Sequence, residues 1–279
     1  MKIKVLHTTL IFFVLVVFCL TSTSVMGKQL VIPGTGASEV ILQELATAFN
    51  AGNPGSEVVI PISVGSGGGI NLVATGENIL GRVARPLKKV EQNHGLKHLV
   101  FAKDMVVFAV GSKVGVDNLS SQQLADLYSG KISNWQEVGG NDARVRLLIR
   151  NPEDSAYEII KQTLKPFQGI EFSSKAKVMF HDYDQVNALN KYSTVICWLS
   201  NSTLKIVDPS VKPIAIDSVA PTQQNVYDGN YALVFEYALV YKEGELRGLA
   251  RKFVEYIFSR EGNRLLVSEG LVPVSDQKF

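Results

Sequence analysis

An arginine at the end of an apolar run is the first residue of this chain whose type and setting suggest ligand chemistry. In the stretch LLIRNPEDSAYEII, Arg150 ends the run, and Glu153 and Asp154 follow it closely. A guanidinium group can bind a tetrahedral oxyanion through two parallel hydrogen bonds. The pattern therefore allows two interpretations: Arg150 is an anion ligand, or it forms a surface salt bridge with Glu153 or Asp154.

The residues after Arg150 also predict the start of a helix. Ser155 and Glu158 have the spacing of a capping box, and Pro152 favours a turn just before it. Free backbone N–H groups and the positive end of the helix dipole make such a start suitable for an anion. A helix start and an anion site are thus compatible interpretations of one segment.

Two glycine-rich loops have the same potential. PGTGASEV (residues 33–40) and VGSGGGIN (residues 64–71) each lie between a strand-like run and a helix-like run. Glycine lets a backbone approach a ligand closely, and the hydroxyl groups of Thr35, Ser38 and Ser66 are possible donors. Ser38 could instead simply cap its helix. Together the loops predict an anion site made of neutral donors.

The known enzyme motifs that use such loops are absent from the sequence. Glu39 and Ile70 stand where a dinucleotide fingerprint needs its third glycine, and neither loop ends in the G-K-[ST] of a P-loop. Val64 occupies the first glycine position of a nucleophile elbow. His94 and His98 lie four residues apart without any zinc-binding pattern. We expect no catalytic set, no metal and no cofactor.

The first 27 residues have the pattern of a secretory signal peptide. A basic start, MKIK, precedes the apolar run LIFFVLVVFCL, and Val25 and Gly27 suit the small cleavage positions. The apolar run is shorter than the roughly 20 residues that a membrane span needs, which argues against an anchor. A lipoprotein signal would use Cys19, but the bulky Phe18 before it is unfavourable. We predict cleavage near Gly27.

Composition and charge exclude several classes of protein. The 279 residues are 46% hydrophobic and 19% charged, which is ordinary for a globular protein. Removal of residues 1–27 would leave 26 Lys and Arg against 26 Asp and Glu, so no basic domain suggests nucleic acid. Cys197 would then be the single cysteine, and its apolar neighbours predict a buried small side chain.

Strand-like and helical patterns alternate along the chain, which predicts an α/β fold with a largely parallel sheet. Strands are expected over 28–34, 56–65, 99–111, 144–150, 193–199, 211–216 and 231–242, and helices over 38–52, 68–77, 120–129, 155–167 and 244–262. Ser120 and Gln123 form a second predicted capping box, and Gly130 is the expected stop of that helix.

Six segments of the chain have a recognisable family pattern: GTGASEVILQELATAF, GSGGGINLVATGE, VARPLKKVE, LSSQQLADLYSGKISNWQEVGG, IAIDSVAPTQQNVYDGNYALVFEYALVYK and KFVEYIFSREGNRLLVSEGLVPV. Together they resemble the phosphate-binding proteins of phosphate ABC transporters. The similarity runs from about Val31 to Val274. The block around SGKISNW and the C-terminal block are its most specific parts.

The resemblance implies a fold and a domain division. It implies a periplasmic binding protein of type II, with two α/β lobes, two crossover strands and a ligand cleft between the lobes. The first lobe would be residues 28–104 plus 238–279, and the second 105–237, with crossovers around DMVVFAV and FEYALVY. The family expectation is a monomer that is no enzyme.

The resemblance also implies a ligand set. The family positions fall on Ser38 and the amide of Glu39 in the first loop, on Ser66 in the second and on Arg150 in the third. Neighbouring loop residues complete the candidate set: Thr35, Gly36, Gly67, Arg85, Asp154 and Ser155.

Two departures from the family concern the ligand. Family members carry an S-G-T pattern after the arginine, where this chain has Asp154, Ser155 and Ala156. Where the better-studied members have an aspartate that accepts the hydrogen of hydrogen phosphate, this chain has Ala84 followed by Arg85. Either Asp154 has taken that role, or the ligand is another one. Arg85 is interpreted as a second cation or as a structural residue.

The leading hypothesis is therefore an extracytoplasmic protein that captures phosphate and delivers it to a membrane permease of an ABC importer. A second hypothesis is a binding protein for another oxyanion or an organophosphate. A third is a sensor or adhesion protein that kept the fold without uptake.

Overall fold

The computed structural model describes residues 28–274. The predicted signal peptide and its cleavage position lie outside the described residues. Within residues 28–274, every helix is too short or too polar to cross a membrane.

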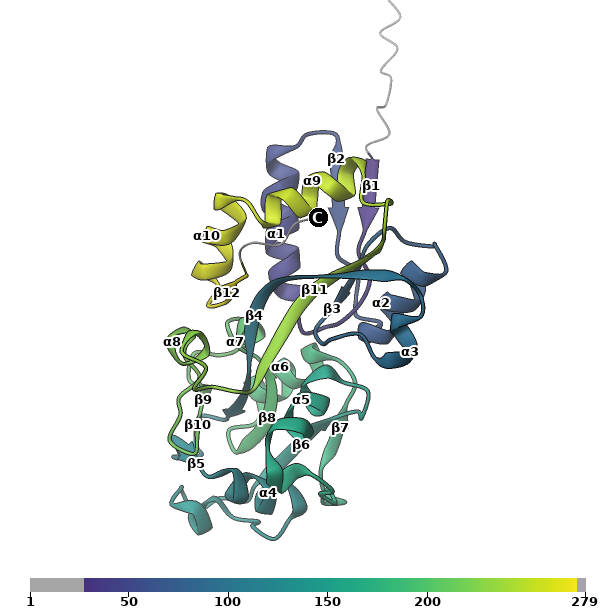
Figure 1. Cartoon of the computed structure of the whole chain (residues 1–279). Helices are drawn as coiled ribbons and strands as arrows, with labels where there is room; N and C mark the ends of the chain where they lie inside the picture. The colour runs from purple at the N-terminus through teal and green to yellow at the C-terminus, as the bar shows by residue number, and fades with distance from the viewer. Residues whose placement is uncertain (1–27, 275–279) are drawn as a thin grey trace, which may run out of the picture.

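The described chain folds into two lobes that lie one above the other in Figure 1. The elements of the first lobe are β1 (Lys28–Val31), α1 (Glu39–Gly52), β2 (Ser56–Val59), α2 (Gly65–Ala74), β3 (Gly81–Val83), α3 (Lys89–Gln92), α9 (Gly248–Ile257), α10 (Arg260–Ser268) and β12 (Val272–Pro273). The elements of the second lobe are β5 (Asn118–Leu119), α4 (Ser121–Ser129), η1 (Trp135–Val138), β6 (Arg146–Arg150), α5 (Ser155–Thr163), η2 (Lys165–Phe167), β7 (Lys177–Met179), α6 (Asp182–Lys191), β8 (Val195–Ser200), α7 (Asn201–Leu204), β9 (Lys212–Pro213), β10 (Ala215–Ile216) and α8 (Gln223–Tyr227).

Two long strands connect the lobes. β4 (Leu96–Val110) and β11 (Val234–Lys242) lie side by side and pass from one lobe to the other (Figure 1). β4 pairs with β11 as far as Met105, and from Val106 onward it pairs with β8. The single strand β4 therefore forms backbone hydrogen bonds with strands of both lobes.

The sheet is mixed, so the prediction of a largely parallel sheet is wrong. In the order β3-β11-β4-β8-β6-β7, β11 is antiparallel to β3 and to β4, and β4 is antiparallel to β8. Only β8, β6 and β7 run parallel in this sheet, and β1 pairs with β2 in a separate parallel sheet. The reason is that β4 leaves the first lobe and β11 returns to it, so the two strands must run in opposite directions.

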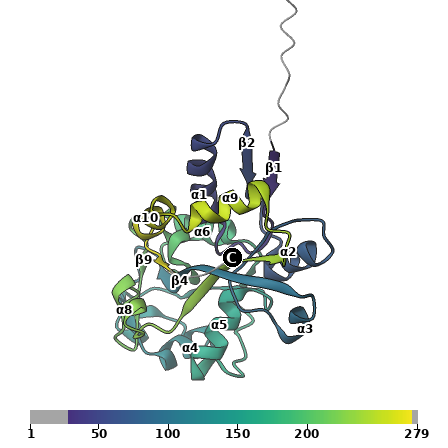
Figure 2. The same ribbon diagram turned by 45° about the horizontal axis from the view of Figure 1, so that its top comes forward.

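The predicted C-terminal helix is two helices rather than one. α9 ends at Ile257, and α10 begins after Ser259, whose hydroxyl group accepts a hydrogen bond from the Gly262 amide at 3.2 Å. This cap stops the continuous run, because a capping side chain competes with helix continuation. α9 packs against α1, and Figure 2 shows the two helices next to each other. The ring centroids of Phe49 and Phe253 lie 5.3 Å apart between them. The predicted Ser120–Gln123 capping box and the predicted helix stop at Gly130 are confirmed, and Gly130 is left-handed there.

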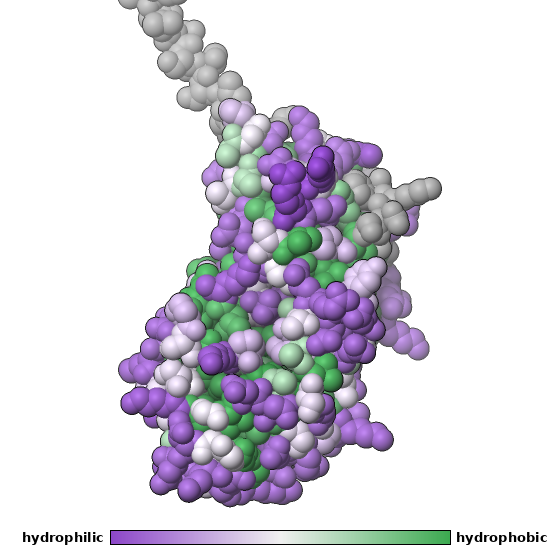
Figure 3. All heavy atoms as spheres, turned by 90° about the vertical axis from the view of Figure 1, so that its left-hand side faces the viewer, coloured by the Kyte–Doolittle hydropathy of each residue, from purple (hydrophilic) through white to green (hydrophobic). Residues whose placement is uncertain are grey.

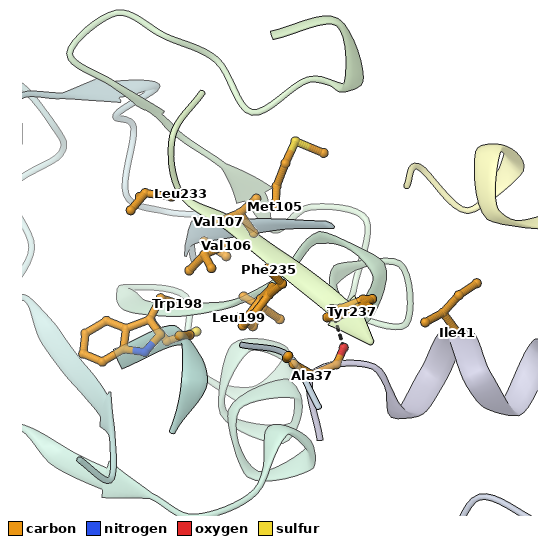
Figure 4. Packing of buried hydrophobic residues seen from close by; sticks show 14 of the residues in the cluster. Ala37, Ile41, Met105, Val106, Val107, Trp198, Leu199, Leu233, Phe235 and Tyr237 are labelled. Carbon is orange, nitrogen blue, oxygen red and sulfur yellow. Dashed lines mark hydrogen bonds between the residues drawn. The ribbon is translucent and has the colours of Figure 1, made fainter. Parts of the chain in front are cut away.

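Polar side chains cover much of the face in Figure 3, with hydrophobic residues showing between them, mainly in the second lobe. The buried apolar side chains form a cluster that continues through the crossing of β4 and β11 (Figure 4). Trp198, Phe235 and Tyr237 are its large members at the crossing, and each is almost completely buried. Cys197 is buried beside them, as predicted. The crossover strands are therefore held by packing on both sides.

Candidate anion-binding site between the lobes

A hollow of about 330 Å³ lies between the two lobes. The first lobe contributes the loop before α1 and the start of α2, and the second contributes the end of β6 and the starts of α5 and α6. Six of the predicted site residues line it: Thr35, Gly36, Ser66, Arg150, Asp154 and Ser155. The structure thus brings the three predicted segments together.

A buried arginine that we did not predict organises the first loop. Arg82 is fully buried, and its guanidinium group donates hydrogen bonds to the carbonyl oxygens of Ile32, of Thr35 at 2.8 Å and of Pro61 at 2.7 Å. Burial lowers the pKa of Arg82 to about 10, and the Glu39 carboxylate at 3.2 Å opposes that shift. These three carbonyl oxygens are therefore held by a cation.

Close backbone packing explains two glycines of the first loop. Gly34 has a φ of 148°, and a Cβ there would lie 1.9 Å from the Arg82 carbonyl oxygen. The Gly34 carbonyl oxygen accepts hydrogen bonds from the Val64 amide at 3.0 Å and the Ser63 hydroxyl at 3.1 Å, which ties the two glycine loops together. Gly36 faces the second lobe, where a Cβ would lie 2.1 Å from an Asp182 carboxylate oxygen.

Ser66 and Ser155 join the lobes inside the hollow. Their hydroxyl oxygens are 3.1 Å apart, and both residues are buried. Ser66 Oγ also accepts a hydrogen bond from the Ala84 amide at 3.3 Å. Because Ser66 belongs to α2 and Ser155 to α5, the two lobes are closed onto each other at this point.

Arg150 ends β6 and is buried at the hollow, so the salt bridge with Asp154 that the second interpretation predicted is present but does not lie at the surface. Its Nε and Nη2 atoms lie 3.0 and 2.9 Å from Asp154 Oδ2, and Nη2 lies 3.5 Å from Asp182 Oδ2. Burial would lower the pKa of Arg150, but Asp182 and Asp154 outweigh it, and the pKa is raised. Nη1 is buried and has no hydrogen-bond partner among the described residues. Arg150 Nη1 is therefore a donor nitrogen without a partner in the described part of the chain.

The capping box predicted from Ser155 and Glu158 is wrong by one residue, because Asp154 is the N-cap of α5. Asp154 Oδ1 accepts hydrogen bonds from the amides of Ala156 at 3.0 Å and Tyr157 at 3.2 Å, while Oδ2 pairs with Arg150. Both carboxylate oxygens of Asp154 are thus engaged in the second lobe.

Replacing Asp154 with alanine should reduce the free energy of unfolding by about 2 kcal/mol, because the helix loses its cap and Arg150 loses its nearest carboxylate. Urea denaturation of the variant and the parent protein measures this loss. Glu153→Ala, at the exposed neighbouring position, is the matched control and should change stability by less than about 0.5 kcal/mol. Equal stability of Asp154→Ala and the parent would contradict the capping role.

Four predicted site residues do not line the hollow. Arg85 donates two hydrogen bonds of 2.8 Å to the Glu91 carboxylate, which supports the structural interpretation of Arg85. The Glu39 amide donates to the Gly36 carbonyl at 2.9 Å. Ser38 is completely buried, and its hydroxyl has no hydrogen-bond partner among residues 28–274. Gly67 lies in α2 next to Ser66 but does not itself line the hollow.

Asp182 is the charged neighbour of Arg150 that we did not predict. It begins α6 in the segment FHDYDQ, where the sequence drew attention only to His181, which does line the hollow. Burial raises the pKa of Asp182, Arg150 opposes this, and Asp154 adds to it. The sequence signal that could have found Asp182 is a pair of acids, Asp182 and Asp184, that follows the short apolar run VMF.

Across residues 28–274, no three His, Cys, Asp or Glu side chains are grouped so that they could hold a metal ion.

Comparisons with known proteins identify the family of this chain. The PBP superfamily domain matches residues 21–261. The phosphate-binding protein PstS of Bacillus subtilis is 30% identical, and the alignment covers 92% of this chain and 86% of the relative. A relative of the same name from Borreliella burgdorferi is 22% identical and covers 88% of this chain.

Solved structures of phosphate-binding proteins have the same fold as this chain. A phosphate ABC transporter substrate-binding protein from Clostridium perfringens, solved with bound phosphate, has a TM-score of 0.81 and 27% identity, covering 89% of this chain and 100% of that one. An ABC-type phosphate transport receptor from Vibrio cholerae has a TM-score of 0.67 at 24% identity, covering 87% and 99%. The two-lobe fold predicted from the resemblance is confirmed. This chain belongs to the PBP superfamily and, within it, to the family of the phosphate-binding protein PstS.

Proposed function

We propose that this protein captures inorganic phosphate between its lobes outside the cytoplasm and delivers it to the permease of an ABC importer. The observation that carries the proposal is Arg150, a buried cation that lines the hollow and whose Nη1 has no hydrogen-bond partner within residues 28–274. Ser66, Ser155 and Thr35 place neutral hydroxyl groups around the same hollow. One cation with several neutral donors suits a small tetrahedral oxyanion. Relatives named phosphate-binding proteins support a binding protein rather than an enzyme.

We propose lobe boundaries within the crossover strands, with the first lobe as residues 28–104 plus 238–279 and the second as 105–237. Two backbone features support this division. β4 exchanges β11 for β8 as its partner between Met105 and Val106, and the pairing of β11 with β4 is irregular between Tyr237 and Ala238. Residues 275–279 lie outside the described chain.

Closure of the lobes gives Arg85 a role other than direct ligand binding. Arg85 and Lys88 of the first lobe lie 3.9 and 3.8 Å from the Glu158 carboxylate of the second lobe. Together with the Ser66–Ser155 contact, these ion pairs favour the closed arrangement. An open form would separate them and admit the ligand.

The mature protein is proposed to be an exported monomer. A signal peptide cleaved near Gly27 would direct export of the chain. Both lobes that form the hollow come from one chain, so a second copy is not needed to complete it. Intact mass of the secreted protein tests the cleavage position, and light scattering tests the monomer. A mature chain that begins far from Lys28 would contradict the cleavage prediction.

An organophosphate is the second candidate ligand, because a hollow of about 330 Å³ exceeds the needs of a single phosphate ion. Isothermal titration separates the candidates, using protein stripped of bound ligand and phosphate, sulfate, molybdate, a small phosphate monoester and buffer as titrants. We expect strong heat with phosphate. The absence of heat with phosphate would overturn the proposal, and preference for the monoester would establish the alternative.

A further inference from the structure

A groove lined by positive side chains lies on the second lobe, outside the hollow between the lobes. It consists of two adjoining hollows of about 400 Å³ each, which share Arg146, Leu147 and Lys175. Neither of them shares a lining residue with the hollow between the lobes. All of the cationic residues that line the two hollows are exposed, and together they are called the cation groove here: Arg144, Arg146, Lys175, Lys177 and Lys191.

The cation groove lies at the other end of the parallel strands from the hollow between the lobes. β6 and β7 belong to the lower lobe of Figure 1. Arg146 begins β6, and Arg150, which lines the hollow between the lobes, ends it. The rise of a strand puts these two residues about 13 Å apart. β7 runs parallel to β6 with Lys177 opposite Leu148, so β7 begins at the same edge as Arg146.

Three segments of the chain supply the five cations. Arg144 and Arg146 come from the segment RVR at the start of β6, and Lys175 and Lys177 come from KAK at the start of β7. Residues two apart in an extended chain project to the same side, which places both members of each pair at the groove. Lys191 ends α6, which packs beside β7.

The protein does not balance the positive charge of the cation groove. None of its five cationic side chains forms an ion pair with a carboxylate within residues 28–274. Asp184 is the single acid among the described residues that line the two hollows. The guanidinium carbon of Arg146 lies 4.0 Å from the centroid of the Tyr192 ring, and Lys191 Nζ lies 5.3 Å from the same centroid. One aromatic ring therefore holds two cations close together.

We propose that the cation groove binds a linear chain of phosphate groups, with inorganic polyphosphate as its simplest form. The chain after residue 27 carries equal numbers of basic and acidic residues, so the attraction comes from a local excess and not from net charge. A concave groove admits an extended chain, whereas the flat surface of a membrane does not enter it. This inference goes beyond the proposed function and does not depend on the ligand of the hollow between the lobes.

The arrangement of the cations favours phosphate over carboxylate groups. Arg144 and Arg146 offer planar forks that match two oxygens of one phosphate, and the lysines offer compact charges. These donors come from three segments, so a ligand group meets them from several directions. A phosphate group directs its oxygens tetrahedrally, while a carboxylate holds both of its oxygens in one plane. A chain with a charge on each repeat can also contact several cations at once, which raises its affinity.

Titration of the full mature chain with short-chain inorganic polyphosphate tests the proposal. Excess orthophosphate is present throughout, so that a site for single phosphate ions contributes no heat. Arg146→Gln combined with Lys175→Gln removes the two cations that line both hollows. We expect this double variant to bind polyphosphate at least about tenfold more weakly, with the slope of log K against log salt reduced by about two.

The matched control removes the same charge from the first lobe. Lys89→Gln combined with Lys252→Gln changes two exposed lysines of α3 and α9 and should leave polyphosphate binding unaltered. Lys175→Gln combined with Lys177→Gln leaves Arg146 stacked on Tyr192, and it serves if the first double variant does not fold. The same loss of affinity is expected for it.

Each contrary result overturns a different part of the inference. Equal losses in the groove variant and the first-lobe control would show a dependence on net charge alone and overturn the groove as the site. Equally tight binding of poly-glutamate of the same total charge would overturn the assignment to phosphate. Tighter binding to vesicles of anionic phospholipid would replace the chain with a membrane surface. A parent without affinity for polyphosphate would overturn the inference and leave the proposed function untouched, because orthophosphate binding is measured separately.

Discussion

Replacing Arg150 with alanine is expected to weaken phosphate binding by at least about 100-fold, which corresponds to about 3 kcal/mol. The loss has two physical sources. The ligand loses the charge-assisted hydrogen bond that the free Nη1 atom can donate. Asp154 and Asp182 also lose the cation between them, so their charges repel an incoming anion. Isothermal titration on stripped protein measures the change.

Two further variants separate charge from geometry. Arg150→Lys keeps the positive charge but not the planar fork, so we expect an affinity between those of the parent and the alanine variant. Arg144→Ala removes an exposed arginine that precedes β6 and should leave affinity unaltered. Phosphate binding by a folded Arg150→Ala protein within twofold of the parent would rule out Arg150 as the main ligand cation.

Replacing Asp104 with asparagine is expected to change how stability depends on pH. Asp104 lies in β4, and its buried carboxylate accepts hydrogen bonds from the amides of Met105 at 2.7 Å and Ser202 at 3.1 Å. The Tyr237 hydroxyl lies 2.9 Å from Asp104 and 2.5 Å from the Ala37 carbonyl oxygen (Figure 4 shows the latter bond). One hydroxyl hydrogen cannot serve both acceptors, so a protonated Asp104 that donates to Tyr237 satisfies all three groups.

The direction of the pH effect follows from the raised pKa. Burial raises the pKa of Asp104 from 3.8 to about 6, although its hydrogen bonds oppose the shift. Between these values the unfolded chain has released the proton while the folded protein keeps it. The contribution of Asp104 to the free energy of unfolding is therefore complete below about pH 4. It falls by about 3 kcal/mol as the pH rises through 6.

Urea denaturation at several pH values between 4 and 7 measures this contribution as the stability of the parent minus that of Asp104→Asn. We expect the difference to fall by about 3 kcal/mol across the range, because asparagine does not titrate. Taking the difference cancels the carboxylates that both proteins share. Asp117→Asn, at an exposed position, should give a nearly constant difference. A constant difference for Asp104→Asn as well would show that Asp104 does not hold its proton in the folded protein.

Helices with a strong apolar period were predictable from the sequence, and one polar helix was not. α1 buries Ile41, Leu45 and Phe49 along one face, which gives a clear periodic signal. α6 has the mainly polar sequence DYDQVNALNK, and one of its buried positions is Gln185. Its period is therefore weak, and the helix that carries Asp182 was missed.

Strand direction was not encoded in the local pattern. A buried strand is a run of apolar residues whether its neighbour is parallel or antiparallel, so the runs at β4 and β11 were correctly placed but their relation was not. The path of the chain between the lobes decides it. The same holds for the division of α9 and α10, where a single capping contact at Ser259 interrupts a continuous amphipathic pattern.

The family and the parts of the site at the ends of strands could be predicted from the amino-acid sequence alone. Two glycine loops and Arg150 are local features, because a glycine loop or an arginine before a helix has the same chemistry wherever the chain goes. Which charged side chains meet at the site depends instead on how the chain folds in three dimensions. The tertiary structure paired Arg85 with Glu91, gave Arg82 the carbonyl oxygens of the first loop, and set Asp182 against both Gly36 and Arg150. The contacts of Arg82 and Asp182 join residues far apart in the chain, and the one between Asp182 and Gly36 also requires the two lobes to close.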